Sequence, residues 1–245
     1  AANGLIARNA GRLGKNLWTE GERGEPITLY AGFNEQDEAR YIVEQAETWF
    51  GDGNPRRSIA ILYRSNAQSR VLEEALLREG IPYRIYGGQR FYERLEIRNA
   101  LAYLRLAQTR DDDPALERVL NTPPRGIGSK TVEKIREVAR AEQIPMWRAI
   151  HRTREQSLLP ARALTALGNF QALIDELDRS SETLPLDELT QHVMEVSGLL
   201  DYHRSEKGER GQARVENLQE LVTATRLFEP EDEETSPLQA FLDSA

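Results

Sequence analysis

The chain has 245 residues, of which 39% are hydrophobic and 29% charged, and its formal net charge is −8. This length allows one large domain or two modest ones, and no apolar run approaches the ~20 residues that span a bilayer, so we expect no membrane partner. The absence of cysteine excludes disulfides and thiolate metal sites and is typical of a cytoplasmic protein. Because the chain begins with Ala1 and not Met, we expect a piece of a longer protein.

The first part of the chain alternates between strand and helix patterns. The expected strands are 26–33, 59–63 and 83–86, and the expected helices are 35–50, a segment from 67 to Gly80, and one around 97–104. Apolar residues three and four apart, such as Ile97, Leu101 and Leu104, predict the helices, and Ser65 or Asn66 can cap the second of them. Strands alternating with helices predict βαβ units on a small, unfinished parallel sheet.

After the run Asp111-Asp112-Asp113-Pro114 the strand patterns stop. Helix patterns follow at 131–142, 160–179, 186–199 and 214–228, separated by connections rich in Pro, Gly and Ser. The predicted fold class is therefore α/β plus all-α, with a parallel α/β part followed by a helical part.

The stretch from Asn121 to Thr131 reads Asn-Thr-Pro-Pro-Arg-Gly-Ile-Gly-Ser-Lys-Thr and is typical of a tight turn that enters a helix. Backbone N–H groups at such a turn can bind phosphate, while the apolar residue between the glycines packs between two helices. The segment 121–140 carries five basic residues and two acidic ones, which suits salt-sensitive phosphate binding on an otherwise acidic chain. A helix–helix connector with Pro and Gly for steric reasons is the open alternative.

The residues Gly128-Ser129-Lys130-Thr131 resemble the end of a nucleotide-binding P-loop, but the spacing does not fit. That loop needs Lys directly after its second glycine and a strand before the loop. Here Ser129 intervenes, and Pro123 stands where the first glycine belongs.

A second polar stretch follows the expected strand 59–63. Arg64, Ser65 and Asn66 stand where that strand ends and a helix begins, an edge at which open α/β sheets bind ligands. These side chains can contact a phosphate or a base. Simple helix capping, with Arg64 in a surface ion pair, is the alternative.

No catalytic centre is complete in this sequence. The three histidines are far apart and lack zinc-ligand spacing, and no Gly-x-Ser-x-Gly motif supports a catalytic serine. We expect neither catalytic residues nor a metal site.

Three strings of the sequence resemble the UvrD/Rep/PcrA-type superfamily 1A DNA helicases. The longest is "IAILYRSNAQSRVLEEALLREGIPYRIYGGQRFYERLEIRNALAYLR" at Ile59–Arg105, and the others are "NTPPRGIGSKTVEKI" and "KGERGQARVENLQELVTATRLF". The resemblance covers essentially the whole chain. It implies that residues 1–110 are part of a RecA-like α/β subdomain, 2A, and that residues 111–245 form an all-α insertion, subdomain 2B, with a helix-hairpin-helix-like Gly-Ile-Gly turn.

The resemblance also implies roles for the candidate residues. Arg64 and Asn66, with Ser65 between them, match positions that contact the translocating single strand. The turn Gly126-Ile127-Gly128 matches a hairpin that touches duplex DNA. The duplex set comprises Arg125, Gly126, Ile127, Gly128, Lys130 and Thr131, together with Arg98 near the boundary between the two subdomains.

The nucleotide-binding motifs of the family would lie outside this chain, before Ala1 and after Ala245. ATP and Mg²⁺ are thus expected in the full-length enzyme and not on this fragment, which alone should neither hydrolyse ATP nor unwind DNA. The implied function is that of the central piece of a cytoplasmic, ATP-dependent 3′→5′ helicase in DNA repair or replication. The expected partners are single-stranded and duplex DNA, bound without sequence preference, and repair proteins. An alternative is that 2B acts mainly as a protein-interaction or autoinhibitory module.

Overall fold

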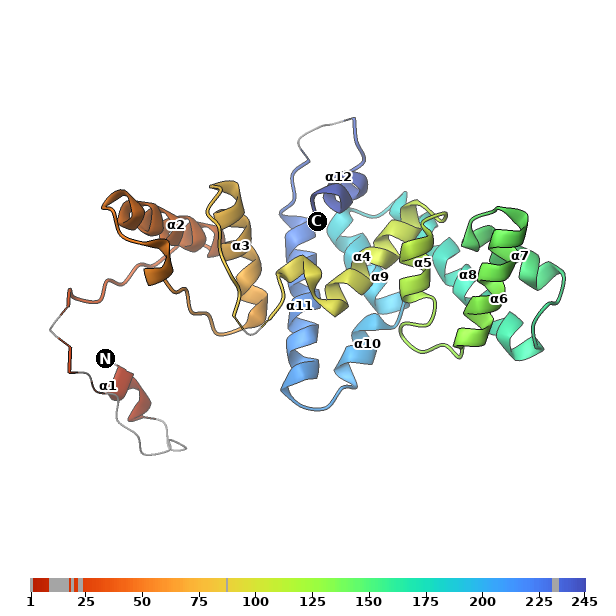
Figure 1. Ribbon diagram of the computed structural model, residues 1–245, viewed down its shortest axis with the longest axis horizontal. Helices are drawn as coiled ribbons and strands as arrows, with labels where there is room; N and C mark the ends of the chain where they lie inside the picture. Colours follow the sequence, from red (N-terminus) through yellow and green to blue (C-terminus); the bar gives the residue numbers. More distant parts are fainter. Residues whose placement is uncertain (1, 9–17, 19, 22–23, 87, 231–233) are drawn as a thin grey trace.

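The computed structural model describes residues 2–8, 18, 20–21, 24–86, 88–230 and 234–245. Helices dominate these residues (Figure 1). The first part of the chain forms α1 (Ala2–Ile6), α2 (Glu35–Gly51) and α3 (Ser69–Arg78), with short 3₁₀ turns η1 (Arg56–Ser58), η2 (Asn66–Gln68) and η3 (Phe91–Glu93).

The rest of the chain is a succession of packed helices. They are α4 (Leu95–Gln108), α5 (Asp113–Val119), α6 (Ser129–Glu142), α7 (Met146–Glu155), α8 (Ala161–Ser181), α9 (Leu186–Val196), α10 (Leu199–Arg204), α11 (Glu209–Arg226) and α12 (Pro237–Ser244). In Figure 1, α2 and α3 lie on one side, α4 and α11 in the middle, and α6 and α7 at the opposite end.

The described residues form no strand, so the predicted α/β plus all-α fold class, with its partial RecA-like parallel sheet, is wrong. No backbone hydrogen bond joins the expected strand segments 26–33, 59–63 and 83–86 to one another. Ile27 and Leu29 are 83% and 93% exposed, and Leu62 is 93% exposed. An alternating apolar pattern selects a face, but a strand also needs a neighbour for its N–H and C=O groups, and no such neighbour is present among the described residues.

The helix ends in the first part follow from local side-chain chemistry. Asn34 caps α2 by accepting the Asp37 N–H at 2.8 Å. Ser65 caps η2, and the Gln68 side chain returns a bond to the Ser65 N–H at 2.9 Å, which completes a capping box. Beyond α3, Gly80 adopts a positive φ of 62°, in agreement with the predicted stop. These local signals needed no distant partner.

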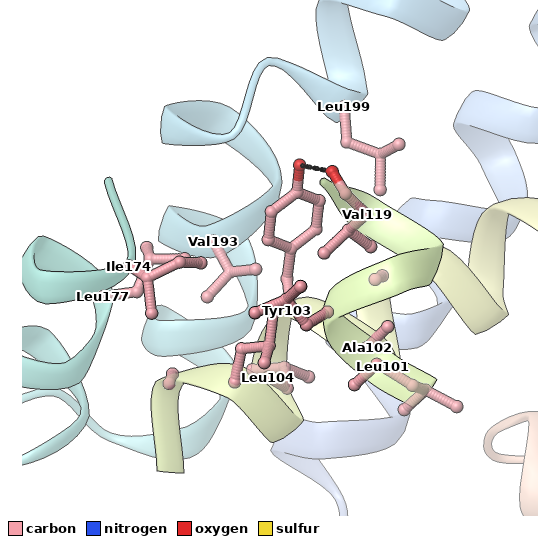
Figure 2. Packing of buried hydrophobic residues seen from close by; sticks show 14 of the residues in the cluster. Leu101, Ala102, Tyr103, Leu104, Val119, Ile174, Leu177, Val193 and Leu199 are labelled. Atoms are coloured by element: carbon pink, nitrogen blue, oxygen red, sulfur yellow. Dashed lines mark hydrogen bonds between the residues drawn. The ribbon is translucent and has the colours of Figure 1, made fainter. Parts of the chain in front are cut away.

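One large core joins the helices from α4 to α12. Helix α4 lies at its centre and packs against α5, α8, α9, α11 and α12. Tyr103 is fully buried there, among neighbours such as Leu104 and Val193, and its hydroxyl lies 3.3 Å from the Val119 carbonyl (Figure 2). The same hydroxyl donates to the Thr122 carbonyl at 2.5 Å. Because α4 shares this core with later helices, the core begins before residue 111, where the sequence placed the domain boundary. That boundary remains a prediction.

A much smaller core lies between α2 and α3. It consists of Val43, Leu76 and Ile81, with a few partly buried neighbours. The two parts of the chain therefore differ sharply in how much apolar surface they bury.

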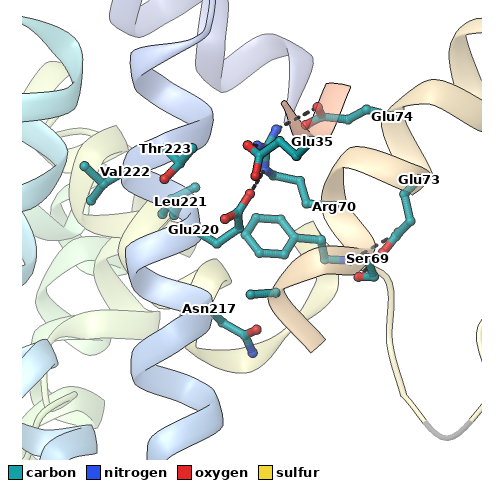
Figure 3. Close-up of polar contacts among 12 residues, drawn as sticks. Glu35, Ser69, Arg70, Glu73, Glu74, Asn217, Glu220, Leu221, Val222 and Thr223 are labelled. Atoms are coloured by element: carbon teal, nitrogen blue, oxygen red, sulfur yellow. Dashed lines mark hydrogen bonds and ion pairs between the residues drawn. The ribbon is translucent and has the colours of Figure 1, made fainter. Parts of the chain in front are cut away.

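Polar contacts connect the first part to α11 (Figure 3). Arg70 on α3 has a side chain only 4% exposed and pairs with Glu220 on α11 at 2.6 Å and with Glu74 at 2.7 Å. Arg94 donates to the Asn217 amide oxygen at 2.9 Å and to the Ser69 hydroxyl at 2.6 Å. These buried, charge-assisted bonds fix α3 and η2 against α11.

Candidate nucleic-acid interface

The turn at 121–128 is held in shape by one side chain. The Asn121 carboxamide oxygen accepts the N–H groups of Arg125 at 2.8 Å and Ile127 at 3.1 Å. Gly126 adopts a φ of 79°, a conformation that residues with a Cβ rarely take, so glycine is needed here. Ile127 is 1% exposed and belongs to the large core, which anchors the turn between α5 and α6.

The turn presents the bare N-terminus of α6. Gly128 is the N-cap, and no side chain caps the helix. The Gly128 carbonyl accepts from Thr131 and Val132, while the N–H groups of Ser129 and Lys130 have no acceptor among the described residues. Free N–H groups at the positive end of a 14-residue helix favour an anion.

Arg125 faces inward. Its guanidinium donates to the carbonyls of Ser197 at 2.6 Å and Pro123 at 2.9 Å, and it lies 5.6 Å from the centre of the Tyr103 ring. The same group lies 5.9 Å from the Phe170 ring. In this geometry Arg125 supports the turn from beneath and does not present its charge at the N-terminus of α6.

The charges on α6 are only partly available to a ligand. Lys134 pairs with Glu137 at 3.1 Å, and Arg136 pairs with Glu117 at 2.5 Å. Lys130 is exposed and pairs with no described residue, whereas Thr131 is buried at 8% exposure. Lys130 is therefore the free cation beside the free N–H groups.

Arg98 lies on α4, exposed and without an ion-pair partner among the described residues. Its neighbour in space is Arg118 on α5, whose pKa is lowered by burial and further by the charge of Arg98. Sequence reasoning missed Arg118, because nothing in the spacing of the chain shows that these two positions meet.

The segment 64–66 is occupied by contacts within the fold. Besides capping η2, the Ser65 hydroxyl donates to Glu216 on α11 at 2.8 Å, and the Asn66 carbonyl accepts from Arg94 at 2.8 Å. The bond from Ser65, with help from Gln212 and the charge of Arg64, lowers the pKa of Glu216. The Arg64 side chain is exposed and makes no hydrogen bond or ion pair with a described residue.

The two predicted sets of site residues do not meet. Residues 64–66 contact α11, while the Gly-Ile-Gly turn joins α5 to α6 beyond it (Figure 1). Sequence reasoning missed Glu216, Asn217 and Glu220, which reach the first part from α11. Asn217 and Glu220 follow Glu216 by one and four residues, so the three lie along one side of α11. Polar residues at this spacing are also typical of a helix face exposed to solvent, so the sequence alone did not identify the contact.

The turn before α6 does not form the P-loop of a Mg²⁺–ATP site. Within the part of the chain that the structure describes, no cluster of three or more His, Cys, Asp or Glu could hold a metal ion. The buried Thr131 and the displaced Lys130 also do not reproduce a P-loop. Among the same residues, no helix is long and apolar enough to cross a membrane.

Comparison with known proteins gives matches over the whole chain. A family model described as "UvrD-like helicase C-terminal domain" matches residues 1–245. DNA helicase II of Escherichia coli (strain K12) is 54% identical over 247 aligned residues, which cover 100% of this chain and 34% of the relative. ATP-dependent DNA helicase PcrA of Bacillus subtilis (strain 168) is 39% identical, over 99% of this chain and 33% of the relative. The chain thus spans about a third of the length of these curated relatives.

Proposed function

We propose, from the premise that this chain belongs to the UvrD-like helicase C-terminal domain family, that it supplies the DNA-binding surfaces of an ATP-dependent 3′→5′ helicase. The parent enzyme would act in the cytoplasm on DNA undergoing repair or replication. In this proposal residues 1–110 serve as subdomain 2A and residues 111–245 as subdomain 2B. Both would bind DNA without sequence preference, and repair proteins are the other proposed partners.

The free N-terminus of α6 is the observation that carries the duplex assignment. A backbone phosphate would accept from the N–H groups of Ser129 and Lys130, and the Lys130 ammonium would add charge. Gly126 and Gly128 leave open space where a side chain would stand, so a phosphate can approach the backbone. Such contacts position a duplex but read no sequence.

The remaining members of the predicted duplex set take different roles in this proposal. Arg125 and Ile127 hold the turn from beneath, and Thr131 lies buried at the start of α6. Arg98 would contact the duplex from α4. Only Lys130 and Arg98 offer an unpaired side-chain charge among these residues.

Lys130→Ala tests the duplex assignment in the helicase that carries this chain. Lys134→Ala is the matched control, because Lys134 lies one turn further along α6 and is paired with Glu137. We expect Lys130→Ala to weaken duplex binding about threefold to tenfold and to reduce its dependence on salt, with a smaller effect of Lys134→Ala. Equal affinities for wild type and Lys130→Ala would show that the turn is a connector.

The nucleotide chemistry belongs to residues outside this chain in our proposal. The chain is homologous to ATP-dependent DNA helicases, but its Gly-Ile-Gly turn lacks the spacing of a P-loop. We therefore expect the 245-residue piece to show no DNA-stimulated ATP hydrolysis. DNA-stimulated ATP hydrolysis above the buffer rate, which persists after contaminating ATPases have been removed, would overturn this assignment.

A second candidate is that α11 restrains the single-strand contacts, and the Ser65–Glu216 bond favours it. Glu216 places an anion beside Arg64 and Ser65, where a backbone phosphate would otherwise lie. If this contact is autoinhibitory, Glu216→Gln should tighten single-strand binding, with Glu209→Gln as a control on the same helix. Unchanged or weaker binding in Glu216→Gln would leave capping and packing as the role of this contact.

A further inference from the structure

A groove of about 640 Å³ lies between α4, α5 and α10, with α11 at its edge. Asn99, Arg118 and Tyr202 line it, and so does Thr122, which follows Asn121 in the phosphate-binding turn. The groove therefore lies beside the start of the turn.

Asn99 is the first sign that the groove is built for a ligand. The residue is only 4% exposed, yet its carboxamide makes no hydrogen bond with any described residue. Its polar atoms are not among the buried ones that lack a partner, so they open on the groove and are not sealed within the core. Because these atoms open on the groove and make no bond within the protein, they are available to a ligand in place of water.

The second sign is a pair of unneutralised arginines. Arg118 lines the groove, half-buried, and makes no ion pair or hydrogen bond with a described residue. Arg98, next to Asn99 on α4, is equally unpaired and close enough for its charge to act on Arg118. Two guanidiniums held together without a carboxylate create a local field that favours an anion.

The other charges of the groove are already satisfied. Glu117 pairs with Arg136, outside the groove, and Arg214 pairs with Glu206 at 2.5 Å. The unpaired donors that line the groove include the Arg118 guanidinium and the Asn99 amide, and the unpaired guanidinium of Arg98 lies beside it. Arginine forks suit the oxygens of phosphate, and a neutral amide adds a donor without adding charge.

We propose that this groove is a second phosphate-binding site, in which Arg118 and Asn99, with the charge of Arg98 beside them, hold a backbone phosphate of the duplex bound at the Gly-Ile-Gly turn. The inference rests on the proposed function for the source of the phosphate, since Thr122 connects the groove to that turn. The turn then binds one phosphate through backbone N–H groups, and the groove binds another through side chains.

Two variants of the helicase that carries this chain test the site, with two probes. Arg118→Gln removes the charge, and Asn99→Leu removes the amide while retaining side-chain volume. The probes are a blunt DNA duplex, followed by fluorescence anisotropy over a salt series, and inorganic phosphate, followed by the rise in melting temperature over chloride at equal ionic strength. Arg162→Gln is the control, because Arg162 is exposed on α8 and outside the groove.

Arg118→Gln should weaken duplex binding about threefold to tenfold, lower the salt slope by about one, and abolish the stabilisation by phosphate. Asn99→Leu should weaken binding about threefold yet melt at about the same temperature without phosphate, because the amide makes no hydrogen bond within the protein that the substitution could remove. A merely structural asparagine would instead lose stability on substitution. Arg162→Gln should leave both probes unchanged.

Lys130→Ala distinguishes failure of this site from failure of the duplex assignment. If Lys130→Ala weakens duplex binding while Arg118→Gln behaves like Arg162→Gln with both probes, the groove proposal is overturned and the turn stands. If neither variant changes duplex affinity but Arg118→Gln abolishes phosphate stabilisation, the groove binds free phosphate and the duplex assignment fails. A wild-type protein that phosphate does not stabilise, with unchanged duplex affinity in both groove variants, would also overturn the proposal.

Discussion

The two parts of the molecule bury their apolar residues very differently. From α4 onward, residues such as Leu104, Phe170 and Leu218 are fully buried in one continuous core. Before Phe91, the buried hydrophobic cluster consists of three residues, and apolar residues such as Phe33, at 97% exposure, are exposed to solvent. Apolar residues that the sequence patterns assigned to a buried face were therefore buried in the later part and, in the expected strands of the first part, largely exposed.

The contrast shows that a helix can bury its apolar residues more readily than an isolated extended segment can. A helix satisfies its own backbone, so it needs only an apolar surface to pack against. An extended segment must first pair its backbone with a neighbouring strand, and only the resulting sheet can bury its apolar face. The following four predictions test how far the two parts differ, beginning with the largest expected effect.

Matched leucine truncations measure the two cores directly. Leu104→Ala should lower the free energy of unfolding by about 3–5 kcal/mol, because Leu104 is 0% exposed at the centre of the large core. Leu76→Ala, in the small core at 7% exposure, should lower it by about 2 kcal/mol. Urea denaturation followed by circular dichroism gives both values. Equal losses would contradict the distinction between a strong and a weak core.

The connection between the parts should depend on Arg70. Although burial opposes its charge, the carboxylates of Glu74 and Glu220 raise the Arg70 pKa above its ordinary value. Arg70→Met leaves Glu220 partly buried and unpaired, so we expect a loss of about 2–4 kcal/mol in urea denaturation. The double variant Arg70→Met, Glu220→Met should recover part of this loss. No recovery would mean that packing, and not charge, makes this contact important.

Substitutions of two basic residues near the turn should distinguish a role in stabilising the fold from a role in binding DNA. Arg125→Met removes bonds to the Ser197 and Pro123 carbonyls and a contact with the Tyr103 ring, and should cost about 1–3 kcal/mol of stability. Lys130→Met, which removes an exposed and unpaired charge, should leave the free energy of unfolding unchanged. Thermal and urea melts of the two variants make the comparison. A stability loss confined to Lys130→Met would reverse the roles assigned to these residues.

The smallest effect is a dependence of stability on pH. His203 is 1% exposed, and burial lowers its pKa despite the contact with Glu206. The unfolded chain therefore takes up a proton below about pH 6.5 that the folded chain does not, so stability is present above that pH and declines as the pH falls. The slope from this residue is at most about 1.4 kcal/mol per pH unit.

His203→Asn provides the test for that slope. Melting temperatures between pH 5.5 and 7.5 should fall with decreasing pH in the wild type and fall less in the variant. His151→Asn is the control for histidine titration in general, because His151 is an exposed histidine on α7. Identical slopes in the wild type and His203→Asn would show that His203 does not carry the effect.

Local signals in the sequence predicted much of the helical structure. The capping of η2 by Ser65, the stop at Gly80 and the start of a helix after Gly128 all follow from side chains within a few residues. The apolar spacing of Ile97, Leu101 and Leu104 likewise indicated α4, and all three are buried. The expected sheet was wrong because its pairing depends on residues that are distant in sequence, which periodicity does not identify.

The candidate sites were accessible to sequence reasoning only in part. The two glycines around Ile127 indicated a phosphate-binding turn, and the structure places free N–H groups there. The inward orientation of Arg125 and the contact of Ser65 with Glu216 gave no sequence signal. Both depend on residues more than 70 positions away, at Ser197 and on α11.

The sequence by itself therefore determined α2, α3, α4, α6, α8, α9 and α11, the capping of η2, the turn at Gly126–Gly128 and the resemblance to a family of helicases. Only the tertiary structure decided which charges remain free. Arg118 and Arg98 stand unpaired beside a groove, while Arg70, Arg94 and Arg136 are neutralised or bonded within the fold. The physical reason is that capping and helix formation act over a few residues, whereas the pairing of a charge depends on whatever the folded chain brings within a few ångströms of it.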